Sequence, residues 1–123
     1  DSIALGHHQD DIIETFIMNM AYKGELSTML PVMQYDKYPQ KVIRPLALVK
    51  EQDCLDFTRL LGISSFTCTC PYGQTSKRLE ARDAIELLAK SGKGVKERIF
   101  QAMHNVIPEY LPRYSSPETE DME

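Results

Sequence analysis

Apolar residues follow two kinds of pattern along this chain. Apolar residues recur every three or four positions in several stretches, which is typical of amphipathic helices. Short, mostly apolar runs that end at a glycine or at Arg44-Pro45 indicate strands instead. The pattern predicts helices over 9–23, 50–61, 75–90 and 95–106, strands over 2–5 and 41–43, and a β-like run over 63–73.

The order of these elements predicts the fold class. A strand–helix–strand–helix opening is typical of an α/β fold with a parallel sheet. Two or three strands are too few to close such a sheet, and the sequence enters its first strand within two residues of Asp1. We therefore expect part of a longer protein: residues 1–63 as the C-terminal portion of an α/β domain, 64–114 as a cysteine-containing turn plus a helical module, and 115–123 as a disordered acidic tail.

The helical pattern also predicts which side chains are buried. One face of the second helix carries Cys54, Phe57, Leu60 and Leu61. Apolar residues at the same spacing mark the inward faces of the other helices and the first strand. They are Ile13, Phe16, Ile17 and Met20; Ala81, Ile85 and Leu88; Ile99, Met103 and Val106; and residues 2–5.

Composition narrows the class of protein. The chain has 123 residues, of which 42% are hydrophobic and 26% charged, enough for one modest core. It contains no apolar run near the roughly 20 residues of a membrane span and no signal-peptide pattern, so we expect a cytoplasmic protein without membrane contact. Three cysteines, two of them one residue apart, indicate free thiols or metal ligands rather than disulfides.

Basic residues gather in one part of a chain whose net charge is −4. Residues 77–98 hold seven basic and four acidic side chains. Such a surplus is compatible with phosphate contacts to an RNA, although a solvated helical face has the same composition. The seven basic residues are Lys77, Arg78, Arg82, Lys90, Lys93, Lys96 and Arg98.

The stretch "GHHQDD", residues 6–11, lies where the first strand hands over to the first helix. Ligands of parallel sheets bind at such junctions, and a helix N-terminus suits phosphate. A carboxylate there can hold a divalent cation that neutralises phosphate charge. Equally, Asp10 or Asp11 can cap the helix, and Glu14 can favour its dipole. From the residues alone, both interpretations stand.

Four motifs in a fixed order resemble a known family. "LGHHQDDIIET" (5–15), "NMAYKGEL" (19–26), "VIRPLA" (42–47) and "QAMHNVIPEYL" (101–111) are similar to motifs of the PP-loop ATP pyrophosphatases. The closer match is to their tRNA 2-thiocytidine synthetase branch. The resemblance implies a Rossmann-like sheet of the adenine nucleotide alpha hydrolase type. It makes residues 1–63 the C-terminal portion of a PP-loop nucleotide-binding domain and the helical part of 64–114 a tRNA-binding module.

The resemblance also implies an activity. Such enzymes use ATP and Mg²⁺ to adenylate a carbonyl oxygen of a tRNA base, here expected to be cytidine, and sulfur from a donor then displaces AMP. By position, Gly6, His7, His8 and Arg44 would bind ATP, Asp10 and Asp11 would serve catalysis, and Asp11 would hold Mg²⁺. For Arg44, an ion pair at the strand end is an equally good interpretation.

The family's Ser-Gly-Gly-x-Asp-Ser phosphate loop is absent from these 123 residues. We expect it upstream of Asp1 in the full-length protein, and we expect this chain alone to be inactive. An exposed strand edge would also favour self-association as a homodimer.

The cysteines carry a second implication. The 2-thiocytidine branch binds an iron–sulfur cluster through three cysteines, two of which would precede this chain. In "CTCPYGQTSKR" (68–78), Cys70 has the better spacing for the third ligand and Cys68 the weaker one. The alternative is two ordinary thiols in a turn. Cys54 lies on the apolar face of a predicted helix and indicates core packing.

Three functions remain open at this point. The first is part of a tRNA thiolation enzyme with ATP, tRNA and a sulfur donor as partners, or another PP-loop enzyme that thiolates uridine or makes lysidine. The second is a non-catalytic nucleotide- or RNA-binding module. The third is a metal-binding domain with His7, His8, Asp10 and Asp11 as ligands.

Overall fold

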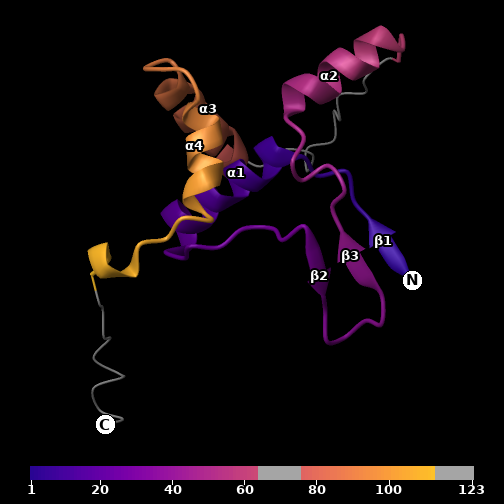
Figure 1. Cartoon of the computed structure of the whole chain (residues 1–123), viewed down its shortest axis with the longest axis horizontal. Coiled ribbons are helices and arrows are strands. Elements are labelled where there is room, and N and C mark those ends of the chain that lie inside the picture. The colour runs from indigo at the N-terminus through magenta and orange to yellow at the C-terminus, as the bar shows by residue number, and fades with distance from the viewer. Residues whose placement is uncertain (64–75, 113–123) are drawn as a thin grey trace.

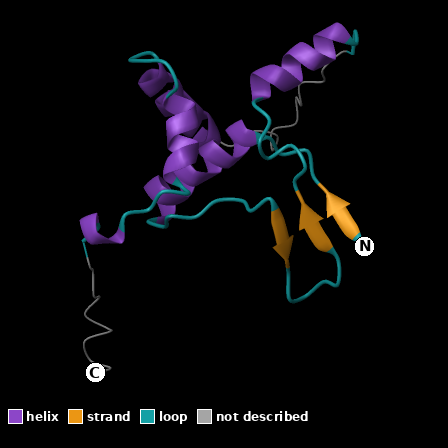
Figure 2. Cartoon of the chain, in the orientation of Figure 1, coloured by secondary structure: helices purple, strands orange, loops and turns teal. Residues whose placement is uncertain are grey.

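A three-stranded sheet forms one side of the molecule. The computed structural model describes residues 1–63 and 76–112. Its strands are β1 (Ser2–Ala4), β2 (Val32–Gln34) and β3 (Lys41–Ile43), in the order β1-β3-β2. β1 pairs with β3 in parallel, with Ile3 opposite Val42, whereas β2 runs antiparallel to β3 (Figure 2). The fold is thus α/β with a parallel pair, as the element order predicted.

Helices make up the rest of the described chain. They are α1 (Gln9–Met18), which continues into a π-helical turn (η1, Asn19–Lys23), α2 (Glu51–Leu60), α3 (Ser76–Ala89), α4 (Val95–Ala102) and a 3₁₀ turn (η2, Pro108–Tyr110). α3 and α4 form a hairpin that packs on α1, while α2 extends away from them (Figure 1). Among the described helices, none is long and apolar enough to cross a membrane.

The elements largely follow the sequence pattern, with two differences. The predicted helix over 9–23 changes from α to π geometry after Met18 and ends at Gly24, whose φ of +67° suits glycine. β2 was not predicted, because a three-residue strand is too short to show alternation. The β-like run over 63–73 lies, apart from Ile63, outside the described residues. The domain boundary at residue 63 stays a prediction.

The described core is centred on α1. Ile13 is 1% exposed, and Ala81 and Ile85 of α3 are buried as predicted. The core also contains Ile12 and Ala47. Because α1 contributes to contacts with both helices of the hairpin, its apolar face is the main hydrophobic support of the described fold.

Several side chains that the pattern marked as core are exposed. On α2, Phe57 is 61% and Leu60 86% exposed, and Cys54 is only partly buried. Ile3 of β1, predicted in a buried strand, is 51% exposed. An amphipathic pattern predicts which face is apolar, but burial also needs a partner, and none of the described residues covers these faces.

We predict that Ile13→Ala destabilises the protein strongly. Truncating a fully buried isoleucine removes apolar contacts and leaves a cavity, which typically costs about 2–5 kcal/mol. Leu87→Ala is the matched control, because Leu87 is 68% exposed on α3 and its truncation is expected to cost less than about 0.5 kcal/mol. Urea denaturation measures both changes, and equal losses for the two variants would contradict the central place of Ile13.

Candidate functional site

The Gly6–Asp11 junction contains a capping box at the start of α1. The His8 backbone N–H donates to Asp11 Oδ2 at 3.0 Å, and the Asp11 N–H donates to His8 Nδ1 at 3.4 Å. The capping interpretation is therefore correct for Asp11, with His8 as its partner. Among the described residues, no donor reaches the second carboxylate oxygen of Asp11, whose side chain is 23% exposed. Asp11 thus keeps one oxygen available for a ligand.

Asp10 lies in a different environment from its neighbour. It is buried, its Oδ1 accepts from the Glu51 N–H at 2.9 Å, and its Oδ2 accepts from Lys96 Nζ at 3.3 Å. The first contact caps α2 and the second is an ion pair with α4. Asp10 therefore joins the beginnings of three helices, and both of its oxygens are occupied.

Arg44 lies at the carboxyl end of β3, beside the end of β1. The Leu5 N–H donates to the Ile43 carbonyl at 2.9 Å, which brings the two strand ends together. Arg44 is 7% exposed, and its Nε donates to His7 Nδ1 at 3.2 Å while Nη1 donates to the Leu30 carbonyl at 2.6 Å. Arg44 forms no ion pair with any described carboxylate, so the ion-pair interpretation does not hold within this part of the chain. Its contact with His7 places both residues at one edge of the sheet.

Glu14 is a structural residue that the sequence did not reveal. It is 3% exposed and accepts from Arg82 Nε at 2.9 Å and from Arg78 Nη1 at 3.3 Å. Arg78 Nη2 also donates to Thr15 Oγ1 at 3.2 Å. The hydrogen bond to Glu14 raises the pKa of the Arg82 guanidinium further, against the opposing effect of burial. These contacts hold α3 against α1.

The basic residues of 77–98 divide into two groups. Arg78 and Arg82 bind Glu14, and Lys96 lies 2.8 Å from Glu86 and 3.3 Å from Asp10. Hydrogen bonds to Glu86 and then Asp10 raise the pKa of Lys96, so it stays charged. The remaining predicted RNA-binding residues, Lys77, Lys93 and Arg98, are exposed, with the Lys77 ammonium 5.2 Å from the Tyr22 ring centroid.

The candidate metal ligands are not assembled into a ready-made site. Within residues 1–63 and 76–112, no group of three or more His, Cys, Asp or Glu side chains has metal-binding geometry. Cys68 and Cys70 lie outside the described residues. Burial raises the pKa of the Cys54 thiol, which disfavours the thiolate that metals bind. Of the junction residues, the Asp11 carboxylate is the one best placed to hold a cation.

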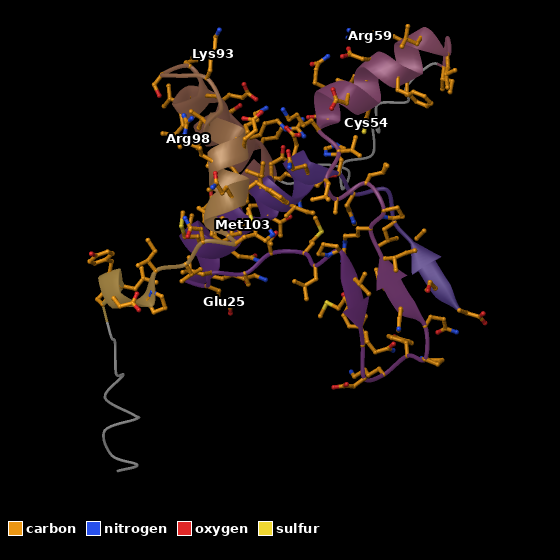
Figure 3. All side chains as sticks on the ribbon, viewed as in Figure 1. Glu25, Cys54, Arg59, Lys93, Arg98 and Met103 are labelled. Atoms are coloured by element: carbon orange, nitrogen blue, oxygen red, sulfur yellow. The ribbon has the colours of Figure 1, made fainter. Side chains whose placement is uncertain are left out.

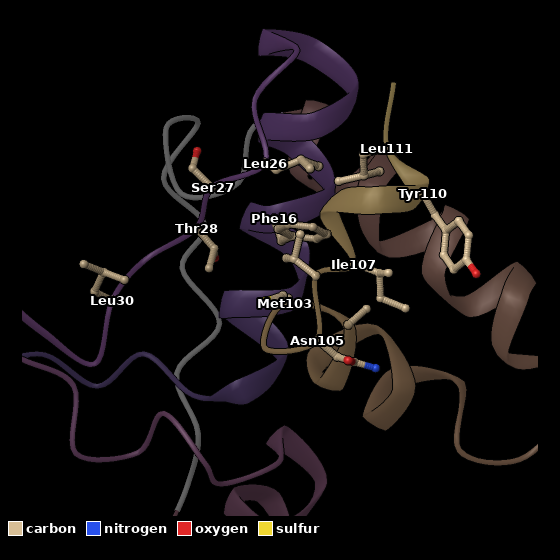
Figure 4. A pocket seen from close by; sticks show the side chains of 12 residues that line it. Phe16, Leu26, Ser27, Thr28, Leu30, Met103, Asn105, Ile107, Tyr110 and Leu111 are labelled. Carbon is tan, nitrogen blue, oxygen red and sulfur yellow. The ribbon is translucent and has the colours of Figure 1, made fainter. Parts of the chain in front are cut away.

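An apolar groove lies beside the far end of α1 from Asp10 and Asp11 (Figure 4). Its volume is about 480 Å³. Leu26 and Thr28 form one wall, and Met103, Ile107 and Leu111 lie across from them. Two of the four sequence motifs, 19–26 and 101–111, therefore contribute to the same hollow.

The amino-acid sequence of this chain is similar to those of known tRNA-modifying enzymes. No protein-family model matches the chain. The chain is 40% identical over 110 residues to a tRNA-cytidine(32) 2-sulfurtransferase of Cellvibrio japonicus and 36% identical over 113 residues to that of Geotalea uraniireducens. These alignments cover 89% and 90% of this chain but 36% and 45% of the relatives. The chain thus spans less than half the length of the curated relatives that it matches.

A solved structure shows the same fold. The U34-tRNA thiolase NcsA from Methanococcus maripaludis, determined with its [4Fe-4S] cluster, aligns with a TM-score of 0.66 and 27% identity. The alignment covers 91% of this chain and 38% of the thiolase. The α/β fold with its strand–helix junction thus resembles part of the fold of a PP-loop tRNA thiolase.

The similarity in sequence is more specific than the fold. Over about nine tenths of its length the chain is similar to part of the tRNA-cytidine(32) 2-sulfurtransferases, the branch that the four motifs predicted.

We predict that Glu14→Gln loosens α3 from α1. Removing the charge of a buried carboxylate leaves Arg82 and Arg78 with a weaker acceptor, and we expect a loss of about 1–3 kcal/mol in the free energy of unfolding. Asp83→Asn is the control, because Asp83 is exposed on the same helix and forms no ion pair with a described residue. Denaturant unfolding compares the two. Equal stability of both variants would rule out the Glu14 contacts as the attachment of α3.

Proposed function

We propose that this chain is part of an ATP-dependent enzyme that replaces the carbonyl oxygen of a tRNA base, cytidine, with sulfur. The main support is the similarity of 89% of the chain to tRNA-cytidine(32) 2-sulfurtransferases, together with a strand–helix junction that leaves one Asp11 oxygen available. In this reaction the base oxygen attacks the α-phosphorus of ATP and pyrophosphate leaves. A sulfur donor then attacks the base carbon, and AMP departs with the oxygen.

The junction residues are suited to the nucleotide end of this reaction. Mg²⁺ is usually held by one or two carboxylates plus substrate phosphates, with water completing the octahedron. Asp11 supplies one such oxygen at the N-terminus of α1, where the helix dipole also favours phosphate. Gly6 carries open space where a side chain would be. We propose that Gly6, His7 and His8 contact ATP, while Arg44 orients His7.

Asp10 has a supporting part in this proposal. Because its two oxygens are bound to the Glu51 N–H and to Lys96, it is a positioning residue for the junction rather than a ligand of the metal. Its burial keeps the start of α1 in place beside α2 and α4. We therefore propose Asp11 as the catalytic aspartate. Asp10, which the resemblance also implied in catalysis, has a positioning role instead.

We infer which tRNA base is modified from the sequence identity of this chain to relatives that act on different bases. The relatives named for cytidine are 36–40% identical, whereas the uridine-34 thiolase structure is 27% identical. Cytidine is therefore the proposed substrate and uridine the second candidate. Cytoplasmic location and self-association stay predictions, the latter supported by the open edge of β1 and the exposed apolar face of α2.

We predict that Asp11→Asn separates capping from catalysis. Asparagine keeps a side-chain oxygen for the His8 N–H but loses the charge that binds Mg²⁺. In the full-length protein with tRNA, ATP, Mg²⁺ and sulfide, we expect thiolated cytidine to fall by at least about 100-fold with little change in melting temperature. Nucleoside mass spectrometry measures the product and identifies the base.

Asp11→Ala completes this test, because it removes both the cap and the charge. It should lose activity to the same extent and also about 0.5–2 kcal/mol of stability. If Asp11→Asn retained full activity, the role of Asp11 would be capping alone. Thiolated uridine in place of thiolated cytidine would favour the second candidate.

The structural relative carries a [4Fe-4S] cluster, and we propose that Cys70 is a ligand of such a cluster in the full-length protein, with Cys68 as the weaker candidate. When bound, the cluster would supply a site for sulfur during transfer. Thiolates are the usual ligands of iron–sulfur clusters, and burial raises the pKa of the Cys54 thiol, which disfavours its thiolate form.

We predict that Cys70→Ser removes the visible absorption of the anaerobically reconstituted full-length protein. Cys54→Ser is the matched control and should leave the spectrum unchanged, since Cys54 lies on α2 as a partly buried thiol. An unaltered spectrum in Cys70→Ser, or its loss in Cys54→Ser, would contradict the assignment.

A further inference from the structure

The ion pairs of the hairpin separate structural cations from exposed ones. Arg82 and Lys96, together with Arg78, bind buried or partly buried carboxylates. A cation that already neutralises a buried carboxylate is costly to withdraw, because the carboxylate would be left buried and unpaired. These three residues therefore hold the helices together and are poor candidates for contacts with a polyanion.

Three other cations of the hairpin are not used in such ion pairs within the described residues. Lys90, Lys93 and Arg98 are exposed and form no ion pair with any described residue. They belong to the α3–α4 turn and the first turn of α4, and we call them the turn patch. Figure 3 shows Lys93 on the turn and Arg98 just beyond it, both on the outer side of the hairpin.

The Arg98 side chain folds back over the turn between α3 and α4. Arg98 Nη1 lies 3.1 Å from the position that a Cβ on Gly94 would occupy, so the guanidinium lies over the turn. The turn itself borders an open hollow lined by residues 89–97, including Lys90 and Lys93. The three cations therefore surround one exposed surface.

Neighbouring acidic groups do not cancel this charge. Glu97 lies 2.8 Å from Lys50, and Glu86 lies 2.8 Å from Lys96. The hydrogen bond from the Lys50 ammonium lowers the pKa of Glu97, in line with their ion pair. Within residues 86–98, Lys90, Lys93 and Arg98 are thus the cations that form no ion pair with a described residue, whereas Lys96 is shared by Glu86 and Asp10. In a chain of net charge −4, such a local patch is what a polyanion would meet.

We propose that the turn patch binds the phosphate backbone of the RNA substrate, an inference that rests on the proposed function. Lysine and arginine side chains on an exposed turn can contact phosphates without contacting bases. Such contacts fix the position of a tRNA on the protein and do not select its sequence. Lys96 follows this turn and pairs with Asp10 beside Asp11. RNA held at the turn patch is therefore positioned relative to the start of α1 by a direct ion pair.

The test uses the full-length protein with Lys93→Ala and Arg98→Ala combined. Losing two phosphate contacts should make the dependence of log affinity on log salt shallower by about 2 and should raise the Kd for tRNA on the order of tenfold near physiological salt. Filter binding or fluorescence anisotropy over a salt series measures both. Binding of ATP should stay unchanged.

Two matched variants sharpen the result. Lys23→Ala combined with Lys37→Ala removes the same charge from exposed sites outside the hairpin and should leave the salt dependence as in the parent protein. Lys93→Arg combined with Arg98→Lys keeps the charge and should keep the affinity. An unchanged slope in the alanine pair, or an equal loss in the Lys23 and Lys37 pair, would overturn the turn patch as the binding surface. A parent protein that binds tRNA through the patch but forms no thiolated nucleoside would contradict the proposed function alone.

Discussion

Two buried carboxylates on α1 hold the described structure together. Asp10 joins the starts of α1, α2 and α4, and Glu14 binds two arginines of α3. Because Asp10 and Glu14 are one turn apart on the same helix face, α1 fixes both helices of the hairpin with a short stretch of sequence. A buried carboxylate must be paired to be tolerated, so the arginines and the lysine are committed to it. These ion pairs fix the position of the hairpin relative to the junction. They also determine which cations of the hairpin stay exposed on its surface.

The capping and ligand-binding interpretations of the junction turn out to concern different atoms. Asp11 uses one carboxylate oxygen for the capping box with His8, which fixes its side chain in place. Its other oxygen is then presented from a rigid helix start rather than from a mobile loop. A site built on a locked rotamer is better organised for a metal-bound phosphate than a free side chain would be. Capping at Asp11 is therefore compatible with the nucleotide binding proposed for it, whereas both carboxylate oxygens of Asp10 bind other parts of the fold.

The helices were predictable from the sequence because their apolar residues repeat over two or more turns, and β1 and β3 because glycine and proline end them. β2 was not, since three residues carry no period, and neither was the π turn at Asn19–Lys23, which depends on a local change of hydrogen bonding. At the junction, spacing indicated that polar groups gather, but the assignment of Asp10 to Glu51 and Lys96 joins residues 41 and 86 positions apart. Such pairings depend on how helices pack, which a single sequence does not show. The four ordered motifs predicted the resemblance to the family, because several motifs in one order are more specific than any one of them.

The division of the basic residues follows from the same constraint that fixes the fold. The seven cations in residues 77–98 are compatible with either an RNA-binding surface or a solvated helical face, and in the sequence each contributes equally to the net charge of that stretch. Burying Asp10 and Glu14 withdraws Lys96, Arg78 and Arg82 from this set. The cations left on the α3–α4 turn are those that form no ion pair with a carboxylate of the described chain. Counting charges along a sequence thus overstates a binding surface wherever a helix must also be held down by ion pairs, and the buried carboxylates show which cations to subtract.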